Sequence, residues 1–132
     1  MRLVGSRLEP AAPYVRSLLR IMAGLLLLSY GLLKLFDFPM PPDFPMQPIF
    51  YVAAYIELPV GILLTLGLFT RPAAFILSGE TAVAYFHSHA PYSFFPIVNQ
   101  GDLPVLFCFT FLYIVFAGGG PLSLDRLIFE TE

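Results

Sequence analysis

Residues 57–77 read ELPVGILLTLGLFTRPAAFIL, in which an apolar run, a short break and a second apolar run follow one another. The break, GLFTRP at 67–72, combines a glycine with a proline, the residues that most often interrupt a helix. Thr70 can cap the helix that follows, and Pro72 suits its first turn. The stretch therefore predicts two helices joined by a tight hairpin, which makes them antiparallel neighbours.

The composition of the whole chain indicates that these helices lie in a membrane. Of its 132 residues, 58% are hydrophobic and only 12% are charged, whereas about a quarter of the residues of a soluble domain are charged. A helix needs about 20 mostly apolar residues to cross a bilayer. Four stretches qualify, at about 17–36, 47–69, 72–89 and 102–118.

We therefore predict an all-α fold, in which residues 1–132 form a single domain built as an antiparallel bundle of four transmembrane helices. Residues 37–48 contain five prolines and should form a stiff loop between the first two spans. GGGP at 118–121 should end the fourth span, and the next residues predict a short surface helix capped by Ser123. No A-x-A pattern follows the first span, so we expect it to be retained rather than cleaved as a signal peptide.

The basic residues predict the orientation of the bundle. Six of the seven precede the first span, lie in the second connection or follow the fourth span: Arg2, Arg7, Arg16, Arg20, Arg71 and Arg126. Lys34 alone lies toward the opposite side. Because basic residues concentrate on the cytoplasmic side of a membrane protein, both termini should be cytoplasmic, and the two proline-containing loops, 37–48 and 90–101, should face outside.

Four polar residues within the spans form a candidate interior site, namely Lys34, Glu57, Glu80 and His87. A charge in the hydrocarbon region costs several kcal/mol unless it is paired or protonated, so such residues are functional candidates by default. We expect both glutamates to face the interior, with a polar pocket opening at His87. Lys34 is within reach of Glu57 or of the histidine region, and Arg20 could approach Glu80. A purely structural ion pair remains an alternative.

Several other kinds of site are excluded or disfavoured. His87 and His89 are two residues apart, so they point to nearly opposite sides of a helix. No other span contains a histidine, which excludes a haem held between two helices of this chain; we expect no metal and no cofactor bound by an evident motif. Cys108 is the one cysteine, so no internal disulfide forms, and we interpret it as a packing residue. No basic cluster indicates nucleic acid.

Five strings between about Arg20 and Arg126 form a recognisable pattern: YGLLKL, ELPVGILLTLGLFTRPAAFIL, GETAVAYFHSHAP, FFPIVNQGDLPVLFCFTFLY and GGGPLSLDRL. With these strings the chain resembles the DoxX family of integral membrane proteins. The chain departs from the family at Asp102, where members often have Glu, and at Leu122, where an aromatic residue is usual. The resemblance implies a compact four-helix protein of the bacterial inner membrane. The family takes its name from a subunit of a thiosulfate:quinone oxidoreductase, and other members are linked to thiol-stress complexes.

Three functions are compatible with these observations, and whether the chain is an enzyme stays open. The first is a membrane subunit of a quinone-linked or thiol-stress oxidoreductase, with a quinone as ligand and a soluble redox protein as partner. The second is a non-enzymatic scaffold or assembly factor, in which the polar residues set helix packing. The third is a small-molecule carrier that moves at a kink near Pro59. All three place the protein in a lipid bilayer and allow it to form oligomers.

Overall fold

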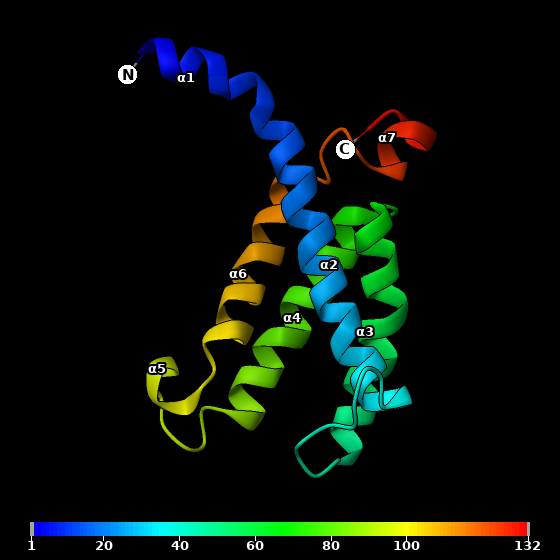
Figure 1. Cartoon of the computed structure of the whole chain (residues 1–132), viewed down its shortest axis with the longest axis vertical. Helices are drawn as coiled ribbons and strands as arrows, with labels where there is room; N and C mark the ends of the chain where they lie inside the picture. The colour runs from blue at the N-terminus through cyan, green and yellow to red at the C-terminus, as the bar shows by residue number, and fades with distance from the viewer. Residues whose placement is uncertain (1, 132) are drawn as a thin grey trace.

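The structure, a computed structural model, describes residues 2–131, and every regular secondary-structure element in that range is a helix (Figure 1). Four long helices dominate it, and they are α2 (Ala12–Phe36), α3 (Pro48–Leu66), α4 (Thr70–Ser88) and α6 (Asp102–Ala117). The shorter elements are α1 (Arg2–Leu8), the 3-10 turn η1 (Glu9–Ala11), α5 (Pro96–Asn99) and α7 (Leu124–Phe129). The all-α class predicted from the sequence is confirmed for this part of the chain.

The long helices agree with the predicted stretches to within a few residues, except at the N-terminus. The first stretch was expected to begin near residue 17, but α2 begins at Ala12, and α1 and η1 extend the helical path to Arg2. Pro10 and Pro13 do not stop this path, because each stands near the start of a helical segment, where its missing N–H has no helical partner. One further helical turn, α5, lies inside the predicted loop 90–101.

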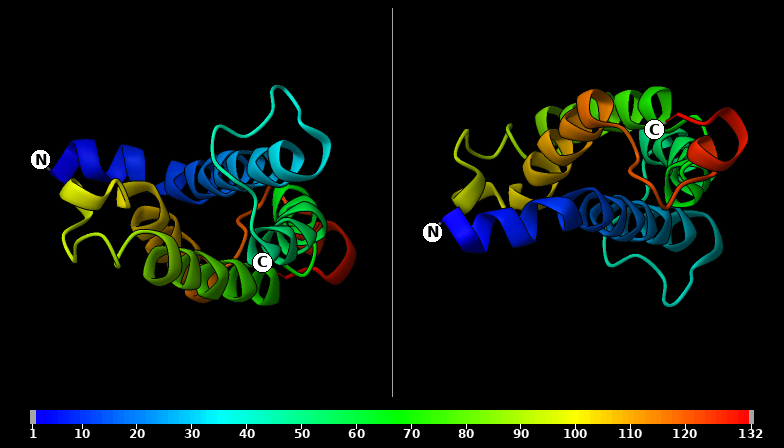
Figure 2. Two further views of the ribbon diagram at one scale, coloured as in Figure 1. Left: turned by 90° about the horizontal axis from the view of Figure 1, so that it is seen from below. Right: turned by 90° about the horizontal axis from the view of Figure 1, so that it is seen from above.

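The long helices pack mainly as two pairs, α2 with α3 and α4 with α6, and α3 also packs on α4 (Figure 2). Consecutive helices run in opposite directions, so α1 and α7 lie at the same end of the molecule (Figure 1). The core contains Leu27, Leu64, Leu77, Phe111 and Ile114, which are all almost completely buried. Phe107 and Phe111 stack with parallel rings whose centroids are 5.4 Å apart.

Glycines allow α2 and α3 to approach closely. A Cβ added at Gly24 would lie 2.5 Å from the Thr65 hydroxyl oxygen, and one added at Gly31 would lie 2.9 Å from Cγ of Leu58. Small residues on a helix face permit this kind of backbone contact, which replaces the hydrophobic driving force that is absent between helices in lipid. The contact at Gly31 is important below, because it brings α2 against the turn of α3 that carries Glu57.

The hairpin between α3 and α4 is as short as the sequence predicts, but its helix cap is different. Gly67 ends α3 in a left-handed conformation, with φ of 74°, and its N–H bonds the last carbonyls of the helix. The prediction that Thr70 caps α4 is wrong. The carboxylate of Asp125 caps α4 instead, accepting from the N–H groups of Phe69 at 2.7 Å and Thr70 at 2.9 Å. The carboxylate reaches these N–H groups because the C-terminal segment folds back over the hairpin.

The predicted surface helix at the C-terminus is confirmed. It is α7, and the Ser123 hydroxyl accepts from the N–H of Arg126 at 3.2 Å, as expected of a cap. Arg20 holds the preceding GGGP segment in place through the carbonyls of Gly119 and Leu122. The C-terminal segment is therefore part of the packed structure and not an appendage.

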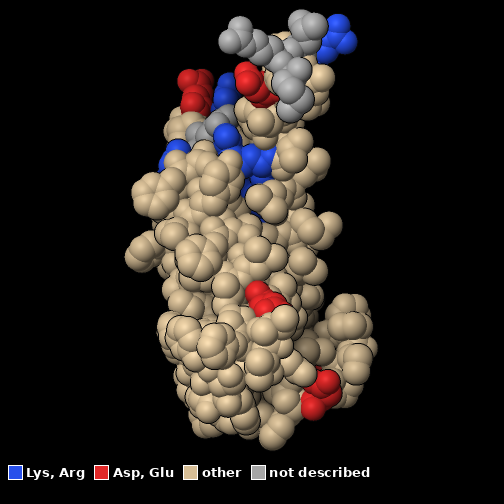
Figure 3. Space-filling view, turned by 90° about the vertical axis from the view of Figure 1, so that its left-hand side faces the viewer, with Lys and Arg blue, Asp and Glu red and all other residues tan. Residues whose placement is uncertain are grey.

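Two helical stretches are long and apolar enough to cross a membrane, Val4–Phe36 and Pro48–Leu66. The α6 helix is apolar but shorter, and α4 is as long as α3 but contains polar residues. On the face drawn in Figure 3, Lys and Arg side chains gather toward the end that carries α1, and most of the remaining surface carries no charged side chain. Many large hydrophobic side chains of the long helices are exposed. This distribution is typical of a membrane protein.

Candidate functional site

The centre of the candidate site is an ion pair between Lys34 of α2 and Glu57 of α3. The Nζ atom of Lys34 donates to Oε1 of Glu57 at 2.8 Å, and the two side chains are 12% and 4% exposed. Lys34 stands in the last turn of α2, where a cation also interacts favourably with the helix dipole. The sequence left two partners open for Lys34, and in the structure its partner is Glu57.

Local packing explains why Glu57 faces inward. Ala54, Glu57 and Gly61 are buried on one face of α3, at the spacing of three and four residues that places side chains together. Gly31 of α2 lies against this face, and a Cβ at Gly31 would be 3.3 Å from the Cβ of Glu57. The close approach removes the carboxylate from solvent and presents it to the ammonium group of Lys34 one turn further along α2.

Glu80 of α4 is the third charged member of the site. Its carboxylate lies within the electrostatic field of both Glu57 and Lys34. Its Oε2 atom is buried and has no hydrogen-bond partner in the part of the chain that the structure describes. Since Lys34 already neutralises Glu57, the site carries one negative group more than it carries positive groups when all three are ionised. Glu80 is thus an acceptor without a donor.

His87 does not join these residues. Its side chain is exposed, and its ring meets that of Phe50 edge to face with centroids 6.2 Å apart. Its Nδ1 atom lies 3.2 Å from the hydroxyl of Ser88. No hydrogen bond or ion pair within residues 2–131 connects it to Glu57 or Glu80. The structure therefore brings three of the four candidate residues together and leaves His87 in the last turn of α4.

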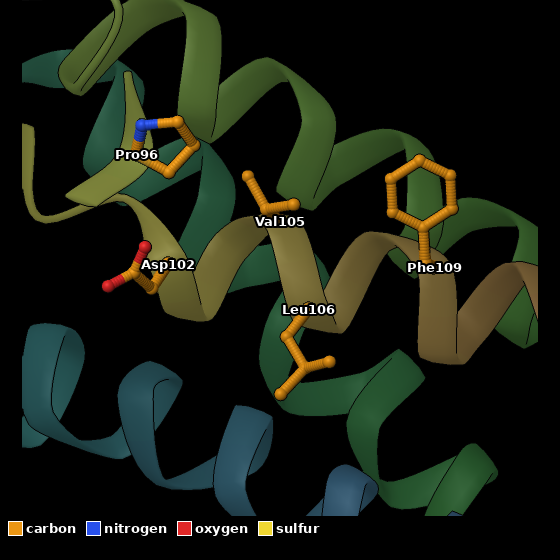
Figure 4. A pocket seen from close by; sticks show the side chains of 5 residues that line it. All are labelled: Pro96, Asp102, Val105, Leu106 and Phe109. Atoms are coloured by element: carbon orange, nitrogen blue, oxygen red, sulfur yellow. The ribbon is translucent and has the colours of Figure 1, made fainter.

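Two surface cavities lie near the C-terminal end of α4 and the N-terminal end of α6, and neither is lined by the four candidate residues. One has a volume of about 390 Å³ and is lined by Ser88, His89, Tyr92, Val98, Asn99 and Gln100. The other is an apolar groove of about 460 Å³ along one side of α6, with Asp102 at its end (Figure 4). Neither of these cavities is the polar pocket that we expected to open at His87.

The sequence did not reveal the partners of Arg20. Arg20 as a whole is 1% exposed, and its terminal nitrogens donate to the carbonyls of Gly119, Leu122 at 2.8 Å and Thr65 at 3.3 Å. Ser17, one turn earlier, donates to the carbonyl of Gly119 at 2.9 Å. The expectation that Arg20 approaches Glu80 is wrong, because the carbonyls of the GGGP segment hold the guanidinium at the other end of the molecule. The adjacency of Ser17 and Arg20 on one helix face was the available signal.

The remaining sequence candidates have ordinary surroundings. Within residues 2–131, no group of three or more His, Cys, Asp or Glu side chains could hold a metal ion. Cys108 is half-buried, and its backbone carbonyl accepts from the hydroxyl of Ser78 at 2.8 Å. Ser78 also lies 3.5 Å from the Cys108 sulfur, so the thiol is part of the contact between α4 and α6.

Comparison with known proteins gives one family and two relatives. The DoxX family model matches residues 15–90. An uncharacterised protein of Haemophilus influenzae is 42% identical over 132 residues, which cover 95% of this chain and 98% of the relative. A second uncharacterised protein of that organism is 35% identical over 92 residues, or 69% of this chain and 61% of the relative. No solved structure matches the chain.

Proposed function

We propose that this chain is a membrane subunit of a quinone-linked or thiol-stress oxidoreductase complex. The chain belongs to the DoxX family of membrane proteins. In this proposal Lys34, Glu57 and Glu80 handle the protons that accompany electron transfer to a quinone. A soluble redox protein supplies the electrons. The chain itself carries no evident motif for a redox cofactor, which is why we assign it the role of a subunit.

The observation that carries the proposal is the unpartnered carboxylate oxygen of Glu80 beside a neutralised ion pair. A structural polar residue in a membrane normally satisfies its hydrogen bonds within the protein, because each unsatisfied group there is costly. A single proton on Glu80 would balance the charge of the site and give its oxygen a hydrogen. The site is therefore suited to take up one proton and to release it again.

The proposed topology places this site in the outer half of the membrane. At 1.5 Å per residue, α4 spans about 28 Å and α6 about 24 Å, which approaches the thickness of the hydrocarbon core. With all four long helices in the bilayer, the arginine-rich end that carries α1 and α7 is cytoplasmic. The ion pair, near the opposite end of α2, then lies toward the outer face of the bacterial inner membrane.

A scaffold function is the second candidate, and the Lys34–Glu57 contact favours it. An ion pair between two helices can fix their register without taking part in any reaction. In that case the site would tolerate loss of the Glu80 charge, because Glu80 takes no part in the pair. The two functions therefore make different predictions for the same substitution.

The test uses Glu80→Gln and Glu57→Gln, with Glu9→Gln as the matched control at the opposite, exposed end. Each variant is produced in the native membrane, and quinone reduction is measured with thiosulfate or a low-molecular-weight thiol as donor. We expect Glu80→Gln to lower the rate about tenfold or more, as is typical when a proton-transfer group is lost, at unchanged abundance. Quinone should be extractable from the purified protein. Full activity of Glu80→Gln with no extractable quinone, together with lowered abundance of Glu57→Gln, would instead favour the scaffold function.

A further inference from the structure

The loop between α4 and α6 presents an unusual set of side chains to the outside. Residues 90–101 contain no Lys, Arg, Asp or Glu. Five large apolar or aromatic residues are from 64% to 85% exposed, and they are Tyr92, Phe94, Phe95, Ile97 and Val98. A loop that faced water would gain nothing from exposing this much apolar surface, and it would promote aggregation.

Hydrogen bonds hold the loop in a defined conformation. The side chain of Asn99 is buried, donates to the Tyr85 hydroxyl at 3.1 Å and to the Ser93 carbonyl, and accepts from the N–H of Gly101 at 2.8 Å. The Tyr85 hydroxyl in turn donates to the carbonyl of Phe94. His89 contributes through Nδ1, which lies 3.0 Å from the Asn99 carbonyl. The Asn99 side chain and the carbonyls of Ser93 and Phe94 are thus bonded within the protein, and the apolar side chains of the loop are displayed on a defined frame.

The displayed surface continues the apolar side of the bundle. Leu103, Leu106 and Phe109 of α6 are all exposed, and the bilayer is the environment that suits such a helix face. α5 projects sideways from α6 at the end opposite α1 (Figure 1). Asp102, the exposed first residue of α6, marks where this face meets water. The loop therefore lies at the level of the lipid headgroups, where tyrosine and other aromatic residues concentrate.

We propose that residues 92–98 are an interfacial anchor that inserts into the headgroup and upper acyl region of the outer leaflet. The partner is the lipid surface itself. The other outer loop, 37–47, contrasts with it because Asp37 and Asp43 interrupt its apolar residues. That loop should remain in water. The anchor would fix the outer ends of α4 and α6 relative to the bilayer.

The absence of tryptophan from the chain allows a direct test. Phe95→Trp and Met40→Trp each introduce a single fluorophore, the first in the proposed anchor and the second, as a matched control, in the acidic loop. Both variants are reconstituted into phosphatidylcholine vesicles with and without bromine on the upper acyl chain. We expect Phe95→Trp to show a blue-shifted emission and at least twofold stronger quenching by brominated lipid than Met40→Trp, with the opposite order for aqueous iodide.

Two outcomes would overturn the proposal. Equal iodide quenching of both variants without quenching by brominated lipid would place residues 92–98 in water. A blue-shifted Phe95→Trp emission that neither quencher affects would show that protein covers the loop, whether a second copy or another subunit. Circular dichroism and the elution volume in detergent establish that each variant is folded before reconstitution, and Tyr92→Trp provides a second fluorophore if Phe95→Trp fails this check.

Discussion

The two polar clusters of this bundle are built differently. At the α1 end, Arg20 reaches three backbone carbonyls, and Asp125 accepts from two backbone N–H groups. Among the described residues, Nε of the guanidinium and the Thr70 hydroxyl oxygen have no hydrogen-bond partner there. Toward the other end, Lys34 and Glu57 satisfy one another, while Glu80 keeps a buried oxygen without a donor. The first cluster connects the C-terminal segment to the long helices, whereas the second keeps a carboxylate oxygen that can still bind a proton or accept a hydrogen bond.

The largest effect should come from breaking the first cluster. Arg20→Ala removes hydrogen bonds to Gly119, Leu122 and Thr65 and frees the C-terminal segment from α2. We expect a loss of about 4 kcal/mol in the free energy of unfolding, since a bond to a charged group contributes about 1.5–3 kcal/mol. Unfolding in mixed detergent micelles measures it. Arg7→Ala, an exposed position at the same end, should change stability by no more than about 0.5 kcal/mol; equal effects would mean that the cluster is not structural.

The next effect tests whether the second cluster also carries structural energy. Lys34→Met leaves the carboxylate of Glu57 buried without its counterion, which should cost about 3 kcal/mol. Adding Glu57→Met should restore most of the loss, because an apolar pair of similar volume often replaces a buried ion pair without penalty. The double-mutant cycle, followed by thermal unfolding in detergent, gives the coupling energy. A coupling near zero would mean that Lys34 and Glu57 do not hold α2 and α3 together.

A smaller effect concerns the helix contact on which both clusters depend. Gly24→Val would place a side chain within 2.5 Å of the Thr65 hydroxyl and 3.0 Å of the Thr65 backbone nitrogen, so α2 and α3 must separate. Overpacking of this kind costs about 2 kcal/mol. Gly79→Ala is the matched control, because no atom lies within 4 Å of an added Cβ there. It should be neutral or stabilise α4 by up to about 1 kcal/mol; destabilisation by both would point to a general intolerance of substitution.

Much of the fold could be predicted because it depends on local sequence. The signals that predicted it are local: runs of about 20 apolar residues, the break at GLFTRP and the prolines of 37–48. The bounds of α3, α4 and α6 followed from these signals. The same local reasoning failed at the N-terminus, where the first span was placed from about residue 17 although the helical path continues through Pro10 and Pro13 to Arg2. It also failed at Thr70, whose capping role passed to a residue 55 positions away.

The sequence alone determined which residues were candidates, and the tertiary structure decided how they are combined. The sequence identified Lys34, Glu57, Glu80 and His87 as candidates, because an ionisable group within an apolar run can be recognised without knowing the fold. It could not choose between Glu57 and the histidine region as the partner of Lys34, or show that His87 stands apart. Arg20 illustrates the reason, because its carbonyl partners Gly119 and Leu122 lie about a hundred residues further along the chain. Such contacts depend on how the helices cross. A glycine permits a close crossing only where a neighbouring helix packs against it, and the local sequence does not show which helix that is.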